Sequence, residues 1–118
     1  MSVDRTACIG HGWVISAEKY ETMRATAEAA GQWDNIEEYF RHINSYQENS
    51  DVFFGDIFCT VGQGDYVNIA SIIQSMILMV DEEKFSDAMC EILDICGETV
   101  TPDSFWHEAQ VYMLMLLH

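Results

Sequence analysis

Basic residues are scarce in this chain, which holds five Lys and Arg against twenty Asp and Glu and carries a formal net charge of −15 at pH 7. Charged residues make up an ordinary 21% of its 118 positions, so the acidity arises from missing cations rather than from an acidic tail. From His42 onward, Lys84 is the sole basic residue. This deficit argues against direct binding of nucleic acid or anionic membranes, because Lys and Arg make the phosphate contacts. It favours a basic protein or nucleoprotein complex as the partner.

Proline is also nearly absent, with a single residue, while 49% of the chain is hydrophobic. A chain of this length and composition can bury a core, and we expect one domain over 1–118. The first residues lack the apolar stretch of a secretion signal, and the longest apolar run, 69–80, is too short to span a bilayer. We therefore expect a cytoplasmic protein with reduced cysteines. These cysteines are Cys8, Cys59, Cys90 and Cys96.

Motifs for metal binding and catalysis are missing as well. Cys90 and Cys96 are separated by six positions, which on one helix would turn their sulfur atoms about 120° apart. The chain has neither a C-x-x-C nor a H-x-x-x-H pair. The G-x-G of segment 61–65 lacks the third glycine and the lysine of phosphate-binding loops, and no serine lies in a G-x-S-x-G context. We expect no metal, no cofactor and no enzymatic activity.

The beginning of the chain predicts a strand followed by a helix. Segment 8–16 alternates so that Ile9, His11 and Trp13 share one face, with glycines at positions 10 and 12 on the other. Two glycines on one face predict a close approach of another element, for example a helix, or a bulge. Ser16 is expected to cap a helix that runs to about residue 30, where the following glycine ends it.

The middle of the chain predicts a second helix and a second strand. Asp34 and Glu37 resemble a capping box, which predicts a helix from Asp34 to about Tyr46. Segment 52–61 alternates apolar residues and predicts a strand. A turn at 62–65 is then expected to lead into a short return strand at 66–69.

The end of the chain predicts a short helix through Phe105 and Trp106, and then an ambiguous apolar tail. Segment 109–117 is either a continuation of that helix or a buried strand, and we favour the strand. An exposed apolar edge would aggregate, so we expect this strand to be central or covered by another chain. The whole order predicts an α+β fold, with a small, mostly antiparallel sheet of about three to four strands packed against helices.

The stretch from 69 to 98 has the clearest pattern in the sequence. Its first part, 69–80, is apolar at helical spacing, and its second part predicts an amphipathic helix. The predicted buried stripe consists of Phe85, Ala88, Met89, Ile92, Leu93 and Cys96. The predicted outer face consists of an acidic row, Glu83, Asp87, Glu91, Asp94 and Glu98. Like charges one helical turn apart repel each other, so such a row points to function more than to stability.

Further acids extend this predicted row: Asp81 and Glu82 precede it, and Glu37 and Glu38 lie on another predicted helix. Side chains one turn apart on a helix rise about 5.4 Å, and phosphates along one strand of a duplex rise about 3.4 Å per step. The spacings are of the same order without matching one to one. These residues form our predicted partner-binding site, which would fill the basic groove of a nucleic-acid-binding protein. The alternative is an ordinary solvated surface.

In general character, the chain resembles small acidic phage-type inhibitors, anti-CRISPR proteins among them. The resemblance is carried by the acidic row from Asp81 to Glu98, by Glu37 and Glu38, and by the deficit of basic residues in a short chain without catalytic signature. No motif is matched. The resemblance implies inhibition by occupying a basic nucleic-acid channel, through contact rather than chemistry.

Two other functions remain open at this point. The chain is a candidate structural or adaptor protein that forms a homodimer through its apolar tail, 111–117, with the charge serving solubility. It is also a candidate for sequestering a small ligand between the first strand and the helices, with His11, Trp13 and Tyr66 lining the pocket.

Overall fold

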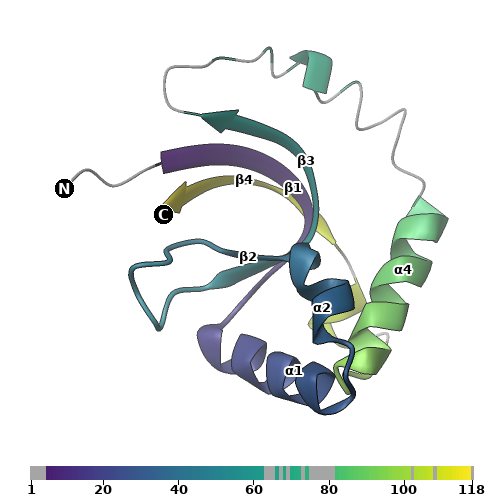
Figure 1. The fold of residues 1–118 in the computed structure, drawn as a ribbon. Helices are drawn as coiled ribbons and strands as arrows, with labels where there is room; N and C mark the ends of the chain where they lie inside the picture. Colours follow the sequence, from purple (N-terminus) through teal and green to yellow (C-terminus); the bar gives the residue numbers. More distant parts are fainter. Residues whose placement is uncertain are drawn as a thin grey trace.

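The computed structural model describes residues 5–62, 66, 68, 70–72, 74, 82–101, 103–107 and 109–117. The elements follow the order β1 (Arg5–Ile15), α1 (Ala17–Ala29), α2 (Trp33–Ile36), η1 (Glu37–Tyr39), β2 (Phe40–His42), β3 (Val52–Gly62), α4 (Glu82–Ile95), η2 (Phe105–His107) and β4 (Gln110–Leu117). A four-stranded antiparallel sheet with helices packed on it confirms the predicted α+β class (Figure 1). The predicted helix over 69–80 and the predicted turn and return strand over 62–69 fall largely outside the described residues.

The sheet has the strand order β2-β3-β1-β4, and each neighbouring pair runs antiparallel. The chain that leaves β2 reaches the opposite end of this order, where Asn44 forms a bridge to Leu117. The Leu117 N–H donates to the Ile43 carbonyl at 2.9 Å, and the Ser45 N–H donates to the Leu117 carbonyl at 3.0 Å. These bonds tie the two outer edges together at one point, so the sheet curls on itself (Figure 1).

Alternation along the strands divides the buried side chains between the two faces of the sheet. On one face, Trp13 stacks on Phe54 with ring centroids 5.6 Å apart, and helical residues such as Met23 and Met89 cover them. Helices α1, α2 and α4 all contribute to this larger cluster. The opposite face holds a smaller cluster of Cys8, Phe53 and Leu114. The larger cluster is therefore the one that fixes the helices on the sheet.

The paired glycines of β1 mark a close approach, as predicted, and the approaching element is β3. A Cβ added to Gly12 would lie 2.1 Å from the Phe54 carbonyl oxygen and 2.8 Å from the Gly55 Cα. Gly55 itself has a φ of 149°, which side-chain-bearing residues rarely adopt. A bulge accompanies the approach: the register shifts between Ile9 and Gly10. The close approach and the bulge are therefore confirmed, but the approaching element is a strand and not a helix.

Helix α1 has the predicted ends. Ser16 is its N-cap, and the Ser16 Oγ accepts a hydrogen bond from the Lys19 N–H at 3.1 Å. Gly31 follows the helix with a φ of 70°, the left-handed conformation that commonly ends helices.

No helix among the described residues has the length and apolar character needed to cross a membrane.

The predicted helix from Asp34 to Tyr46 is wrong. Helix α2 ends at Ile36, and the chain becomes extended at Phe40, which pairs with Phe54 across β2 and β3. The rings of Phe40 and Phe54 stack with centroids 4.8 Å apart, and both are buried. Cross-strand aromatic contacts of this kind stabilise extended chain, and here they outweigh the helical spacing of the apolar residues.

The predicted final strand is confirmed as β4; of the two predicted positions the central one is wrong, and cover by another chain stays a prediction. β4 pairs with β1 on one side and is the outer strand of the sheet. Its exposed side chains are Val111, Met113 and Met115, with exposed fractions of 58%, 68% and 55%. The curl of the sheet brings the Ile43–Ser45 segment to the outer edge of β4, but among the described contacts it meets this edge at Leu117 alone. The rest of the edge therefore has no described strand beside it.

Candidate functional site: an aromatic pocket beneath an acidic helix

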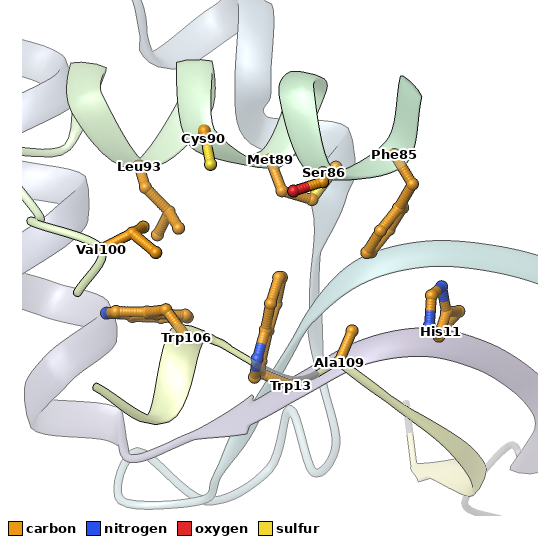
Figure 2. Close-up of a pocket in the computed structure, with 10 residues that line it drawn as sticks. All are labelled: His11, Trp13, Phe85, Ser86, Met89, Cys90, Leu93, Val100, Trp106 and Ala109. Carbon is orange, nitrogen blue, oxygen red and sulfur yellow. The ribbon is translucent and has the colours of Figure 1, made fainter. Parts of the chain in front are cut away.

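A pocket of about 410 Å³ lies between α4 and the sheet, at the end covered by η2 (Figure 2). One wall comes from the sheet side, with His11 and Trp13 of β1 and Ala109 before β4. The other wall comes from α4, and Trp106 of η2 with Val100 closes the end. Segments far apart in the sequence therefore meet around one cavity, whose size is within the range of small-ligand sites.

The sheet wall of the pocket is aromatic and firmly packed. Trp13 is 7% exposed, stacks on Phe54, and meets Trp106 edge-on with ring centroids 5.4 Å apart. The His11 ring lies 4.3 Å from the Phe85 ring of α4, so aromatic side chains bridge the two walls. The Trp13 Nε1 is buried, and among the described residues it has no hydrogen-bond partner.

The helix wall is buried in its centre and open at its rim. Met89 and Leu93 are 1% exposed and face the cavity, whereas Ser86 and Cys90 also line it and are exposed. Figure 2 shows these side chains directed from α4 toward Trp13 and Trp106. Ser86 and Cys90 therefore mark the side of the helix on which the pocket opens.

The exposed acids of α4 stand beside this rim. Glu83 lies three positions before Ser86, while Asp87 and Asp94 lie three positions before and four after Cys90. Residues at these spacings are neighbours on a helix surface. We call Glu83, Asp87 and Asp94 the rim acids.

Four members of the predicted acidic row, Glu83, Asp87, Glu91 and Asp94, are exposed on α4. The ion pairs among the described residues involve other acids: Lys19 pairs with Glu98, and Arg24 pairs with Glu28. Lys84 is the one basic residue within α4 and is exposed as well. The helix therefore presents a predominantly negative outer surface.

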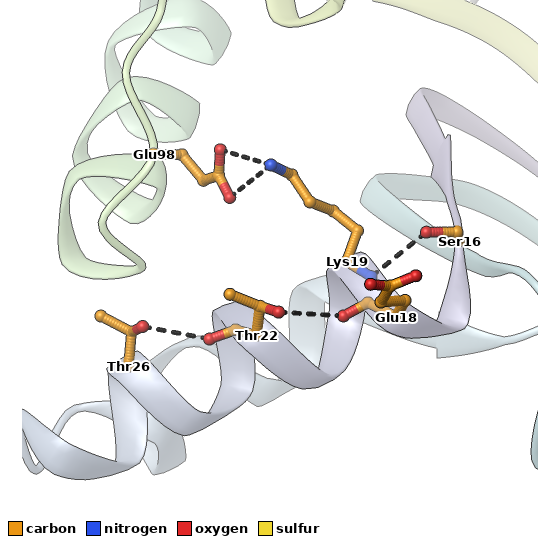
Figure 3. Close-up of polar contacts among 6 residues, drawn as sticks. All are labelled: Ser16, Glu18, Lys19, Thr22, Thr26 and Glu98. Carbon is orange, nitrogen blue, oxygen red and sulfur yellow. Dashed lines mark hydrogen bonds and ion pairs between the residues drawn. The ribbon is translucent and has the colours of Figure 1, made fainter.

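The placement of Glu98 on the acidic face is wrong. Helix α4 ends at Ile95, Gly97 turns the chain with a φ of 76°, and Glu98 folds back toward α1. Its carboxylate meets the Lys19 Nζ at 2.7 Å, and its side chain is 14% exposed (Figure 3). Glu98 is a structural tie between the end of α4 and α1, and it does not belong to the acidic row.

The remaining predicted site residues are dispersed. Glu37 and Glu38 are exposed on η1, a separate element from α4. Asp81 and the Glu82 side chain lie outside the described residues. Tyr66, expected to line a ligand pocket, is 95% exposed and is not among the lining residues. His11 and Trp13, named in the same prediction, do line the pocket.

Titratable groups near the pocket differ in their surroundings. Burial raises the pKa of Asp56, the partner of His11 in the β1–β3 register; the nearby His11 opposes this shift and Glu38 adds to it. Burial, together with the charge of Glu98, raises the pKa of the Cys96 thiol to about 11. Within the described ranges, no three His, Cys, Asp or Glu side chains gather in an arrangement suited to a metal ion.

Sequence reasoning missed Phe85, Met89 and Trp106 as pocket residues, because their spacing is equally typical of a closed core. No local signal in the sequence separates a lining residue from a core residue here. Comparison of the chain with protein-family models, with curated proteins and with solved structures gave no significant match. The function is therefore argued from the residues of this chain.

Proposed function

We propose that the protein is a non-enzymatic binding protein whose acidic row on α4 attaches to the basic nucleic-acid-binding surface of a partner and thereby inhibits it. The observation that supports this proposal is the arrangement of α4. Its apolar face is fixed in the core by Met89, Ile92 and Leu93, while its outer face presents acids that no described ion pair neutralises. A rigid helix holds these charges at fixed spacing, as a basic groove would require.

The use of the basic residues strengthens the argument. Two of the four cations of the N-terminal half, Lys19 and Arg24, are paired with Glu98 and Glu28 within the chain itself. The acids of α4 repel one another, and this repulsion costs stability in the isolated protein. A basic partner would relieve that repulsion on binding, and long-range attraction would speed the encounter.

Inhibition requires no chemistry in this proposal. A chain of net charge −15 covering a basic groove excludes nucleic acid by sterics and by like charge. Anti-CRISPR-like inhibition of a host nucleoprotein complex is the kind of activity that fits this behaviour. The partner would be met in the cytoplasm, where we expect the protein to act.

The test is capture of basic proteins from a bacterial lysate at about 0.1 M salt and at about 0.5 M salt, which shortens the reach of surface charges. We expect a nucleic-acid-binding protein that is retained at low salt, released at high salt and displaced by added DNA. The double variant Asp87→Lys/Glu91→Lys should lose the captured protein by at least about tenfold. The matched control, Glu21→Lys/Asp34→Lys, makes the same charge change on α1 and α2 and should retain it. Equal loss in both variants, or capture indifferent to DNA, would contradict the proposal.

A second candidate function is homodimerisation through β4, favoured by the exposed Val111, Met113 and Met115. The N–H and carbonyl of Leu117 point away from β1 to the Ile43–Ser45 segment. By strand alternation those of residues 111, 113 and 115 also point outward, which suits antiparallel pairing with a second copy. Light scattering should then report a dimer that Met113→Asp disperses, while Tyr66→Asp, at another exposed hydrophobic position, leaves it intact. A monomer at all concentrations would exclude this function.

A further inference from the structure

We infer that the pocket between α4 and β1 is a binding site for a small organic cation with a flat, apolar body. The body would lie among Trp13, Trp106 and Phe85, and the positive group would face the rim acids. This inference does not rest on the proposed protein partner, although its rim acids also belong to the acidic row of α4.

The shape of the cavity argues for a flat, apolar ligand body. Aromatic rings stand on both sides of about 410 Å³ of open space, with Trp13 and Trp106 perpendicular at 76° to each other. Phe85 approaches Trp13 with centroids 6.0 Å apart, near the outer end of the helix wall. Aromatic rings stack on flat ligands and bury large apolar areas, which is the usual composition of small-molecule sites.

The charge around the opening argues for a cation. No Lys or Arg lines the pocket, whereas Glu83, Asp87 and Asp94 flank its exposed rim residues. An anion would enter against these carboxylates and against the net charge of −15. A cation is attracted both by the carboxylates and by the faces of the indole rings.

The molecule already contains a contact of this kind. The Lys19 Nζ lies over the Trp106 ring, 5.9 Å from its centroid, and Glu98 neutralises the ammonium group. The Trp106 indole therefore accepts one cation within the fold. Because Glu98 pairs with Lys19, the ammonium group is compensated and does not dominate the field at the pocket.

The central experiment uses three probes with one indole body and different charges: tryptamine, tryptophol and indole-3-propionate. Isothermal titration calorimetry at about 0.05 M and 0.3 M salt measures each affinity. We expect tryptamine to bind best, tryptophol more weakly and indole-3-propionate at least about tenfold more weakly than tryptamine at low salt, since each exposed charge contributes modestly. The ratio of cation to anion affinity should shrink at high salt. Equal affinities for all three probes, or no binding of tryptamine, would overturn the inference.

Two variants locate the site. Ser86→Trp places a large side chain at the exposed rim and should abolish tryptamine binding while the melting temperature stays close to that of the parent protein. The triple variant Glu83→Gln/Asp87→Asn/Asp94→Asn should reduce the preference for tryptamine over tryptophol. A matched triple, Glu21→Gln/Asp34→Asn/Glu48→Gln, removes the same charge from positions that line no part of the pocket and should keep that preference. If both triples act alike, net charge explains the binding and the rim assignment fails.

Cys90 supplies an independent readout, because it is exposed at the rim while Cys8 and Cys96 are buried. Saturating tryptamine should slow alkylation of Cys90 by iodoacetamide at least about threefold, as expected when a bound ligand covers the thiol. Cys59, which is partly buried and does not line the pocket, serves as the internal control. Unchanged Cys90 alkylation in the presence of bound tryptamine would place the ligand elsewhere and contradict the inference.

Discussion

The two walls of the pocket are built on different principles. The sheet wall places Trp13 on a strand whose close approach to β3 leaves room for glycine alone at position 12, and Phe54 supports the indole from behind. The helix wall is held by the apolar stripe of α4 and by the ion pair between Lys19 and Glu98, and its outer rim is charged. The comparison teaches that the sheet determines the shape of the cavity, whereas the helix determines its charge. Changes in the two walls should therefore have separable effects.

The largest effect is expected from Gly12→Ala in the sheet wall. The new Cβ would lie 2.1 Å from the backbone oxygen of Phe54, so the two strands must separate. We expect a loss of about 3 kcal/mol or more in the free energy of unfolding, because backbone atoms cannot move aside as a flexible side chain can. Guanidinium denaturation followed by tryptophan fluorescence measures this loss.

Gly31→Ala is the matched control. It has a φ of 70° but nothing within 4 Å of the added Cβ, so its cost is limited to backbone strain of about 1–2 kcal/mol. If the two variants were equally stable, the close approach of β1 and β3 would not determine the sheet wall.

The sequence predicts the sheet wall well, for a reason visible in these residues. Alternation in segments 8–16 and 52–61 identifies both strands, and the glycines at positions 10 and 12 indicate the close approach of β1 and β3. Each of these signals is local. The predicted helix over 34–46 is wrong because the interaction that outweighs it is not local. Phe40 is held in the extended conformation by its contact with Phe54, fourteen positions away. Apolar spacing could not disclose that contact.

The pocket itself was predicted in part. One of the alternatives is a ligand pocket between the first strand and the helices that uses His11, Trp13 and Tyr66. His11 and Trp13 do line the cavity, but Tyr66 does not, and Trp106 was left out. Periodicity shows which side chains point inward, but a cavity forms where the inward side chains of two elements do not reach each other. That property depends on how far α4 stands from β1, which no local pattern contains.

An intermediate effect is expected from the ion pair between Lys19 and Glu98, which holds the helix wall. Lys19→Met should lower the free energy of unfolding by about 1–2 kcal/mol, since it leaves the largely buried Glu98 carboxylate without its partner. Glu98→Gln should have a similar effect, and the double variant should lose less than the sum. Thermal and chemical unfolding of the four proteins completes this double-mutant cycle.

Arg24 and Glu28 provide the comparison for that cycle. Their side chains are 43% and 50% exposed, so the corresponding cycle with Arg24→Met and Glu28→Gln should give about 0.5 kcal/mol or less. Equal coupling energies for the two pairs would mean that Glu98 is an ordinary surface acid. Its assignment as the link between α4 and α1, separate from the rim acids, would then be wrong.

The smallest effect is expected from Asp56→Asn, on the sheet side beside His11. Burial raises the pKa of Asp56 above its ordinary value of 3.8, with a further contribution from Glu38 and an opposing one from His11. The folded chain therefore retains this proton to a higher pH than the unfolded chain does. Unfolding in that window releases a proton, so stability falls as the pH rises from below the ordinary pKa through the raised one.

Asparagine at position 56 removes the charge that folding must desolvate. The gain in melting temperature of Asp56→Asn over the parent protein should be near zero at pH 3, where both side chains are neutral, and should reach its full value by pH 7. The matched control is the same substitution at an exposed rim acid, Asp87→Asn, whose side chain stays in contact with water in the folded protein. A gain that is equal at both pH values would assign the effect to packing. Growth with pH would show that the rigid sheet wall retains Asp56 at a cost in stability that the exposed acids of the helix wall avoid.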